Sequence, residues 1–169
     1  MFKSLGVAQA KNRNKKEGIE MTDQEYMLRA IQLAKKGEGW TNPNPMVGAI
    51  IVKEGKIIGE GYHMCYGEAH AEVNAFNNAK EDTKGACLYV TLEPCPMCAG
   101  AIIQSRIKEV VYGASDPKGG CVGTCTNLFE VSEFNHHPEY RKGILESECS
   151  DLLKHFFKKK RDMKKKQKS

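Results

Sequence analysis

The pattern of apolar and polar positions predicts a helix soon after residue 20. Thr22 and Glu25 have the spacing of a capping box, in which each side chain bonds the backbone N–H of the other residue. Glycine is typical of helix C-termini, and Gly37 ends the helical pattern. Between these signals, one face of the segment is apolar: Tyr26, Met27, Ala30, Ile31, Leu33 and Ala34. We therefore expect an amphipathic helix between Thr22 and Gly37.

The rest of the chain alternates between strand-like and helical patterns. Two runs rich in β-branched residues, 47–52 and 56–62, flank Glu54-Gly55 and predict a hairpin. The later segments predict a helix, a buried strand, a helix, a strand and a terminal amphipathic helix: residues 69–79, 86–92, 99–105, 109–113 and 146 to about 160. The crossover over residues 86–113 favours parallel strands. The expected fold class is α/β, a three-layer domain in which helices flank a mixed central sheet.

Length and composition favour one folded domain. A chain of 169 residues with 40% hydrophobic residues can enclose a single core. We predict a disordered basic leader over residues 1–20, the folded domain over 21–157 and a basic tail over 158–169. No apolar run approaches the roughly 18 residues of a membrane span, and the polar beginning lacks a secretory signal. We expect a cytoplasmic protein that is not bound to a membrane.

Charge is distributed unevenly along the chain. Residues 1–18 carry five Lys/Arg and one Glu, and residues 154–169 carry nine Lys/Arg and one Asp. Because the net charge is +5, the region between these ends is acidic. A basic tail attracts phosphates by releasing counterions, whereas the alternative is a solvated, frayed helix end. The sequence leaves both interpretations of the tail open.

Two cysteines and a histidine predict a metal site. Cys95 and Cys98 form a C-x-x-C pair that opens a helix, where free N–H groups and the helix dipole favour thiolates. By itself this pair is consistent with metal binding or with a redox couple. His70 opens the preceding helix, which gives three ligands suited to tetrahedral Zn²⁺ and leaves a fourth position for water. An open fourth position is typical of a catalytic zinc site.

The other five cysteines do not indicate a disulfide scaffold or a second metal site. An odd total of seven, in a chain without a secretory signal, argues against a disulfide scaffold. Cys121 and Cys125 lie in a glycine-rich segment with no other ligand cluster, so we expect no second metal there. Cys65, Cys87 and Cys149 are interpreted as small hydrophobic residues.

Glu72 follows His70 by two residues and is predicted to move protons. A fourth protein ligand would close the metal to water, so this carboxylate is better placed as the general acid and base. Zinc lowers the pKa of its water, Glu72 accepts the released proton, and the hydroxide attacks an amino-bearing ring carbon. Glu72 then delivers the proton to the ring nitrogen and the departing amine, which leaves a ring carbonyl and ammonia.

Together these residues resemble a known signature. His70-Ala-Glu72 followed by Pro94-Cys95-Pro-Met-Cys98 is similar to the H-x-E…P-C-x-x-C signature of the cytidine/deoxycytidylate deaminase superfamily. The resemblance implies a cytidine deaminase-like fold with zinc. From residue 91 on, TLEPCPMCAGAIIQSRIKEVVYGASDPKGG closely resembles bacterial tRNA adenosine deaminases. Residues 39–75, which include TNPNPMVGAIIV and YGEAHAEVNAF, instead resemble the pyrimidine deaminase of riboflavin synthesis.

Three further residues are predicted to bind substrate. Asn44 and His63 flank the hairpin in the segment that resembles the riboflavin enzyme, where the tRNA enzymes differ. For His63, a ribose or phosphate contact and an ordinary loop histidine are both open. Asp116 matches a loop residue near the target nucleotide of the tRNA enzymes, and a turn-former is the alternative. Asn135-His136 also matches the tRNA family, although a polar turn would look the same.

The spacing of the zinc cysteines favours the tRNA enzymes, because the riboflavin enzyme spaces them more widely and usually carries a fused reductase. We predict a zinc-dependent hydrolase that converts adenosine to inosine at the wobble position, with the tRNA anticodon stem-loop as partner. The alternatives are a deaminase of a free nucleoside, a nucleobase or the riboflavin-pathway pyrimidine, and a non-catalytic RNA-binding zinc protein. The intact Glu72 argues against the last. The resemblance also implies a homodimer whose partner completes the substrate surface.

Overall fold

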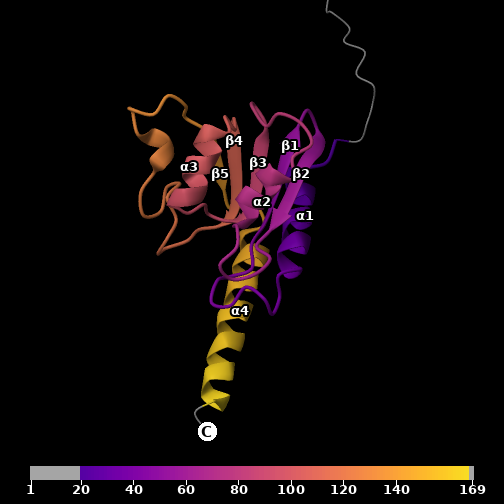
Figure 1. The fold of residues 1–169 in the computed structure, drawn as a ribbon, viewed down its shortest axis with the longest axis vertical. Coiled ribbons are helices and arrows are strands. Elements are labelled where there is room, and N and C mark those ends of the chain that lie inside the picture. The colour runs from indigo at the N-terminus through magenta and orange to yellow at the C-terminus, as the bar shows by residue number, and fades with distance from the viewer. Residues whose placement is uncertain (1–19, 168–169) are drawn as a thin grey trace, which may run out of the picture.

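The computed structural model describes residues 20–167, which fold around a five-stranded mixed sheet (Figure 1). The sheet order is β2-β1-β3-β4-β5, with β1 antiparallel to β2 and β3, and β4 parallel to β3 and β5. The elements are α1 (Asp23–Lys35), β1 (Gly48–Lys53), β2 (Lys56–Tyr62), α2 (Ala71–Asn77), β3 (Cys87–Leu92), α3 (Pro96–Gln104), β4 (Glu109–Ala114), the 3₁₀ turn η1 (Leu128–Glu130), β5 (Glu139–Lys142) and α4 (Glu146–Lys166).

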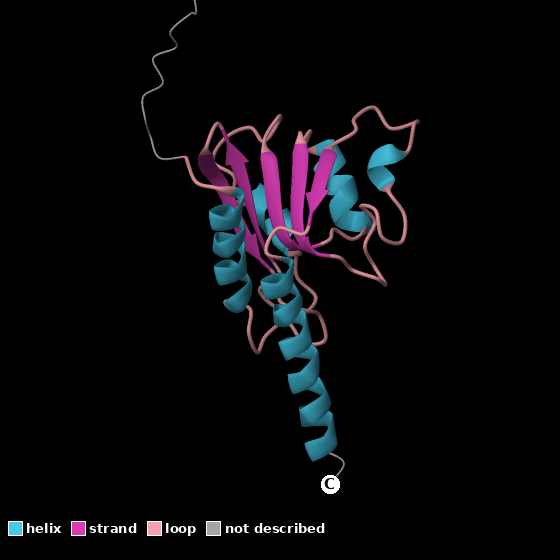
Figure 2. Cartoon of the chain, turned by 180° about the vertical axis from the view of Figure 1, so that it is seen from behind, coloured by secondary structure: helices cyan, strands magenta, loops and turns pink. Residues whose placement is uncertain are grey.

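Helices cover both faces of the sheet, with α2 and α3 on one face and α1 and α4 on the other (Figures 1 and 2). Side chains alternate along each strand and therefore enter two separate cores. Ile51 and Val90 join the cluster under α2 and α3, whereas their neighbours Ile50 and Tyr89 join the cluster under α1 and α4. This arrangement confirms the predicted three-layer α/β fold with a mixed sheet.

Local sequence signals account for the first helix and for the hairpin. The backbone N–H of Thr22 donates to the Glu25 carboxylate at 2.7 Å, and the N–H of Glu25 donates to the Thr22 hydroxyl at 3.3 Å. All six predicted apolar positions of α1 are buried. Glu54 and Gly55 have φ values of 50° and 74°, which a tight turn between two twisted strands requires. The capping box and the hairpin are thus confirmed.

Gly61 allows α2 to approach the sheet closely. A Cβ atom at this position of β2 would lie 2.3 Å from the backbone nitrogen of Ala75 and 2.4 Å from the carbonyl oxygen of Ala71. Neither atom can withdraw, because both belong to the backbone of α2. The missing side chain therefore sets how deeply the first turn of α2 is buried.

Three helices differ in their bounds from the predictions. The helix predicted over 69–79 is confined to Ala71–Asn77. α3 begins at Pro96 rather than at residue 99, because proline suits the first helical position, where no N–H partner is needed. α4 continues past residue 160 to Lys166, since lysine has a good helix propensity and does not end a helix.

The edge strand β5 and the turn η1 were not predicted. The residues of β5 are exposed or half-buried and show no alternation of apolar and polar positions, so no pattern marks them as a strand. Arg141 of β5 instead forms ion pairs with Asp23, at 2.6 Å, and with Glu109 of β4. Tertiary contacts thus define this strand.

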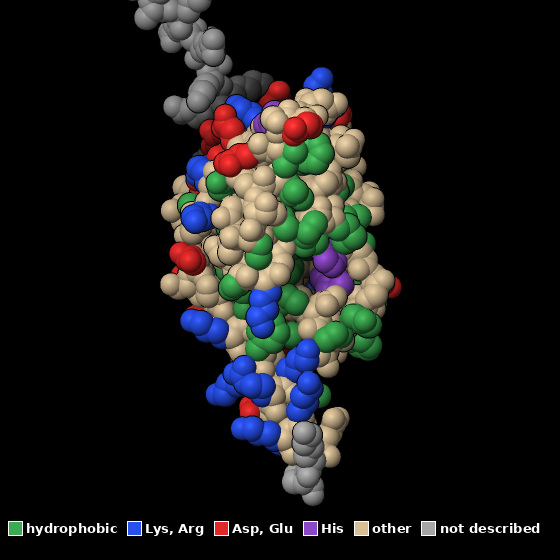
Figure 3. Space-filling view, turned by 90° about the vertical axis from the view of Figure 1, so that its left-hand side faces the viewer, with side chains coloured by type: hydrophobic (Ala, Val, Ile, Leu, Met, Phe, Trp, Pro, Cys, Tyr) green, Lys and Arg blue, Asp and Glu red, His purple; other side chains and the backbone are tan. Residues whose placement is uncertain are grey.

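α4 runs well beyond the sheet (Figure 1). Lys and Arg side chains gather on this end of the molecule, while acidic side chains gather at the opposite end (Figure 3). The predicted leader lies outside the described residues, apart from Glu20. The predicted boundary between domain and tail at residue 157 falls within α4, and this division stays a prediction. Within residues 20–167, no helix has the length and apolar character needed to cross a bilayer.

Candidate active site

His70, Cys95 and Cys98 meet where α2 and α3 begin. His70 and Cys95 are the N-cap residues of the two helices, and Cys98 lies in the first turn of α3. His70 Nδ1 lies 3.7 Å from Cys95 Sγ and 3.5 Å from Cys98 Sγ. Tetrahedral Zn²⁺ with Zn–N and Zn–S bonds of about 2.1 and 2.3 Å separates such ligand atoms by about 3.6 Å. The three side chains therefore fit a zinc ion in composition and spacing.

The two thiols share a proton unequally. The hydrogen bond from the Cys98 thiol, aided by His70, lowers the pKa of Cys95 to about 4. The same hydrogen bond raises the pKa of Cys98. The thiolate of Cys95 in turn raises the pKa of His70 by accepting its hydrogen bond. The lowered pKa of Cys95 favours its thiolate, the form in which cysteine binds metal.

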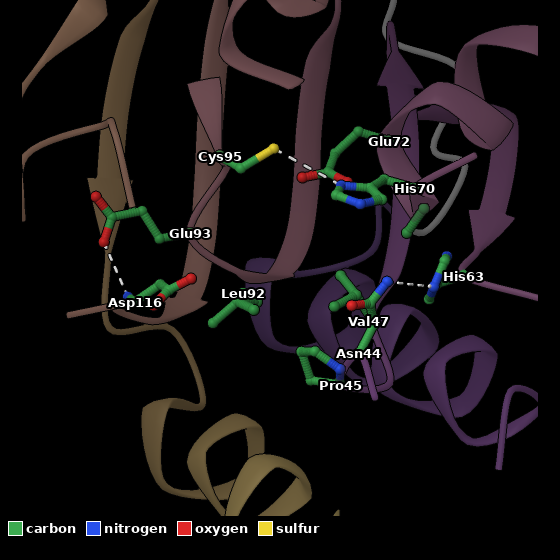
Figure 4. A pocket seen from close by; sticks show the side chains of 11 residues that line it. Asn44, Pro45, Val47, His63, His70, Glu72, Leu92, Glu93, Cys95 and Asp116 are labelled. Carbon is green, nitrogen blue, oxygen red and sulfur yellow. Dashed lines mark hydrogen bonds between the residues drawn. The ribbon is translucent and has the colours of Figure 1, made fainter. Parts of the chain in front are cut away.

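Glu72 stands beside this cluster in the first turn of α2 and is only 4% exposed. Burial disfavours the charged carboxylate and raises the pKa of Glu72. Its side chain lies next to His70 in Figure 4 and faces the same cavity. A carboxylate with a raised pKa can both take up and release a proton, as a general acid and base must.

A cavity of about 130 Å³ opens above these side chains (Figure 4). It brings together six of the seven residues that the sequence predicted for the site, and the seventh, Cys98, is fully buried below. We call His70, Glu72, Cys95 and Cys98 the floor of the cavity. The residues that line it are Asn44, Pro45, Val47, His63, His70, Ala71, Glu72, Leu92, Glu93, Cys95 and Asp116.

Asn44 and His63 form the first wall of the cavity. His63 is 2% exposed, and its Nδ1 lies 3.1 Å from the carbonyl oxygen of Ala69. Because a carbonyl only accepts, Nδ1 carries the proton, and in the neutral ring Nε2 accepts from the Asn44 amide at 3.3 Å. The amide oxygen of Asn44 points away from His63 (Figure 4). The first wall therefore presents a hydrogen-bond acceptor.

Residues 115–124 form the loop that follows β4, and Asp116 of this loop lines the other side of the cavity, so we call the loop the second wall. Asp116 lies here, and its backbone N–H donates to the carboxylate of Glu93 at 3.0 Å. Glu93 was not among the residues predicted for the site. A signal was present, because an acidic residue directly follows the apolar run of β3, a place where a charge needs partners.

Other residues singled out in the sequence lie away from the cavity. Asn135 accepts hydrogen bonds from Arg106, and His136 Nε2 lies 2.6 Å from the carbonyl oxygen of Ile107, so both hold a loop against the end of α3. Within residues 20–167, His70, Cys95 and Cys98 are the one group of three or more His, Cys, Asp or Glu side chains that lie close enough together to share a metal ion. Of the cysteines interpreted as hydrophobic, Cys149 is buried, whereas Cys65 and Cys87 are half-buried.

The fold and the floor together define a zinc-dependent deaminase-like class of protein, in which two helix N-termini present a histidine and two cysteines suited to zinc beside a buried carboxylate. Residues 20–114 match the family described as the cytidine and deoxycytidylate deaminase zinc-binding region, and the chain belongs to this family. This finding confirms the predicted superfamily and zinc as its cofactor.

Relatives of two kinds are similar to this chain. The tRNA-specific adenosine deaminase of Bacillus subtilis (strain 168) is 45% identical over 152 residues, which cover 85% of this chain and 93% of that protein. Riboflavin biosynthesis protein RibD of Actinobacillus pleuropneumoniae is 48% identical over 143 residues, or 81% of this chain. The chain spans only 37% of the length of RibD.

A solved structure confirms the cytidine deaminase-like fold. It comes from studies of A-to-I editing by tRNA:A34 deaminases at the wobble position of transfer RNA. The TM-score is 0.66 at 34% sequence identity, and the match covers 76% of this chain and 98% of that chain. The chain is about equally identical to both kinds of relative, so sequence identity does not indicate the substrate. The residues that form the walls of the cavity are more informative.

Proposed function

We propose that this chain is a zinc-dependent hydrolytic deaminase that converts adenosine to inosine at the wobble position of tRNA. His70, Cys95 and Cys98 hold the zinc ion, which when bound supplies Lewis-acid activation of a water molecule. Glu72 would carry one proton of the attacking water to the ring nitrogen and, after the water has added, would carry the proton of the new hydroxyl group to the departing amine. Water adds to the ring carbon, the C–N bond breaks, and the products are a ring carbonyl and ammonia.

The observation that favours a polynucleotide is a groove that continues from the cavity toward α4. The groove has a volume of about 510 Å³ and shares Pro45, Leu92 and Asp116 with the cavity. Its further lining includes the exposed ring of Phe157 and the cations Lys118 and Arg161. An aromatic ring and cations suit the stacked bases and phosphates of single-stranded RNA, whereas a free nucleobase would leave the groove unused. Asp116 lies where the cavity and the groove meet.

The first wall supports a second candidate, deamination of the riboflavin-pathway pyrimidine. Asn44 and His63 belong to the segment that resembles the riboflavin enzyme, and they form one hydrogen-bonded unit over the floor. An acceptor at this place suits a ribose hydroxyl, which both substrates carry. The first wall therefore allows either substrate, while the groove favours RNA.

We further propose a cytoplasmic homodimer, with residues 21–157 as the catalytic domain and 158–169 as a basic tail. Large exposed apolar side chains near the site support a partner: Trp40, Met64 and Tyr66 lie on the loops that carry the first wall, and Met97 lies in the first turn of α3. Light scattering of the zinc-loaded protein tests the dimer. A monomer at micromolar concentration would contradict it.

A substrate panel at fixed zinc content tests the proposed activity. The zinc-loaded protein is assayed with tRNA, an anticodon stem-loop, adenosine, cytidine, guanine and the riboflavin-pathway pyrimidine, with ammonia and the deaminated base measured by mass spectrometry. We expect turnover of tRNA and of the stem-loop. Turnover of the pyrimidine alone would replace our proposal with the second candidate. RNA binding without any turnover would identify a non-catalytic zinc protein.

A further inference from the structure

The second wall is folded around the carboxylate of Glu93. This residue directly follows β3, is only 2% exposed, and is tied to β4 by its own N–H, which donates to the carbonyl oxygen of Ala114 at 2.8 Å. None of the ion pairs found within residues 20–167 involves Glu93. A buried carboxylate without a cationic partner requires hydrogen-bond donors.

All four donors that Glu93 uses come from the second wall. Oε1 accepts from the backbone N–H groups of Val122 and Thr124, both at 3.0 Å. Oε2 accepts from the backbone N–H of Asp116 at 3.0 Å and from the hydroxyl of Thr124. Hydrogen bonds to a charged acceptor are about twice as strong as neutral ones. The carboxylate thus ties Asp116, near one end of the second wall, to Thr124 at the other end.

The loop packs closely against this carboxylate at Gly120. A Cβ atom on Gly120 would lie 2.3 Å from Glu93 Cδ and Oε2. The backbone of the loop therefore lies directly against the carboxylate. The N–H of Cys121 also donates to the carbonyl oxygen of Pro94 at 3.0 Å, which fixes the middle of the loop.

Asp116 depends on this arrangement for its position. Its N–H is held by Glu93, and its Oδ1 accepts from the N–H groups of Lys118 and Gly119 at 3.0 and 3.1 Å. Both the backbone and the side chain are thereby fixed at the junction of cavity and groove.

We propose that Glu93 is a positioning residue that determines substrate binding through Asp116. The Glu93 carboxylate is engaged by the loop and does not take part in proton transfer. Its role is to hold Asp116 where the target nucleotide enters the cavity. The identity of the substrate rests on the proposed function, whereas the link between Glu93 and Asp116 rests on the loop alone.

Glu93→Gln breaks this link selectively. At the Oε1 position, the new NH₂ group would face two backbone N–H donors, which cannot accept. At the Oε2 position the NH₂ group would face the Thr124 hydroxyl, which can rotate and accept its hydrogen bond. It would also face the N–H of Asp116, which cannot accept a hydrogen bond. The variant therefore keeps its bonds to Val122 and Thr124 and loses the one to Asp116. Thr124→Val is the matched control, because it removes a donor to the same oxygen and leaves Asp116 bound.

The expected result is a change in KM with little change in kcat. For the anticodon stem-loop, Glu93→Gln raises KM roughly tenfold or more, as for the loss of one hydrogen bond to a charged group. Zinc content and kcat stay near wild type, and Thr124→Val has a smaller effect. Combining Glu93→Gln with Asp116→Ala adds nothing to the KM of Asp116→Ala alone. Additive effects, or an equal fall of kcat for every substrate, would overturn the proposal.

Amide exchange separates this proposal from the proposed function. In Glu93→Gln the amide proton of Asp116, followed by NMR, exchanges at least about tenfold faster, while those of Val122 and Thr124 do not change. This measurement needs no substrate. If the substrate panel identifies a small base, the kinetic comparison is made with that base. Unchanged exchange at Asp116 would contradict the role of Glu93 even if tRNA is deaminated.

Discussion

The floor and the walls of the cavity are built by different means. The floor consists of residues in or beside the first turns of two helices, and its positions follow from where α2 and α3 begin. The walls are loops held by side-chain hydrogen bonds, between Asn44 and His63 in the first wall and around Glu93 in the second. Helix starts are fixed by local sequence, whereas these loops depend on partners far away in the chain.

We therefore assign the reaction to the floor and substrate recognition to the walls. In our proposal the floor supplies the metal ligands and the proton-transferring carboxylate, which would serve any amino-bearing ring. The first wall lies in the segment that resembles the riboflavin enzyme, and the second lies in the segment that resembles the tRNA enzymes. An overall identity of 45% or 48% averages over both and does not identify the substrate. Changes to the floor should abolish turnover, while changes to the walls should alter KM and substrate choice.

The largest effect is expected from Cys95→Ala. Two protein ligands rarely retain zinc, so the metal is lost and turnover with it. Elemental analysis of the purified variant checks this outcome against Cys125→Ala, which removes an exposed cysteine and should keep one zinc per chain. Stoichiometric zinc in Cys95→Ala would show that the floor is wrongly assigned.

Glu72→Gln should be nearly as severe while leaving the metal in place. The amide cannot carry the proton, so kcat falls by about 10² to 10⁴-fold, the usual contribution of general acid–base catalysis. Steady-state kinetics at verified zinc content measure the effect, with the exposed Glu81→Gln as control. Wild-type kcat in zinc-loaded Glu72→Gln would remove this residue from the mechanism.

A smaller, substrate-dependent effect is expected from the first wall. Asn44→Ala removes the partner of His63 Nε2 and the hydrogen-bond acceptor that the first wall offers at the cavity. Losing such a bond costs about 1–3 kcal/mol, or roughly 5- to 150-fold in KM, with kcat little changed. Both RNA and a free nucleoside should be affected, whereas Asp116→Ala should affect RNA more. If kcat instead fell equally for both substrates, the first wall would contribute to turnover, and the roles of walls and floor could not be separated.

The smallest effect is expected from the basic end of α4, because single phosphate contacts are weak and screened by salt. Neutralising exposed cations by Lys158→Gln, Arg161→Gln and Lys164→Gln should lower the log–log salt slope of RNA binding by about 0.7 per lost contact. Turnover of a free nucleoside should not change.

The control for this experiment neutralises three exposed lysines outside α4: Lys56 at the start of β2, and Lys84 and Lys108 in loops. If both triple variants shift the salt slope equally, the basic end of α4 has no special part in RNA binding. If neither triple variant shifts the salt slope, the basic end of α4 is a solvated helix end.

The sequence alone determined the floor and most of the elements. His70 and Glu72 lie in one short motif and Cys95 and Cys98 in another, and each motif begins a helix, so local spacing predicts which residues belong to the floor, although His70 meets the two cysteines only through the fold. The capping box of Thr22 and the turn at Glu54-Gly55 are local for the same reason. Such signals act within a few residues and need no knowledge of tertiary contacts.

Tertiary structure decided the walls and the edge of the sheet. Glu93 meets Thr124 across 31 residues, and Arg141 meets Asp23 across 118, distances over which no periodicity operates. Resemblance to the two families suggested Asn44, His63 and Asp116 as substrate-binding residues, but only the fold shows that they line one cavity. The physical reason is that a buried polar group must find partners wherever the packed chain supplies them, and those partners are chosen when the sheet and helices come together.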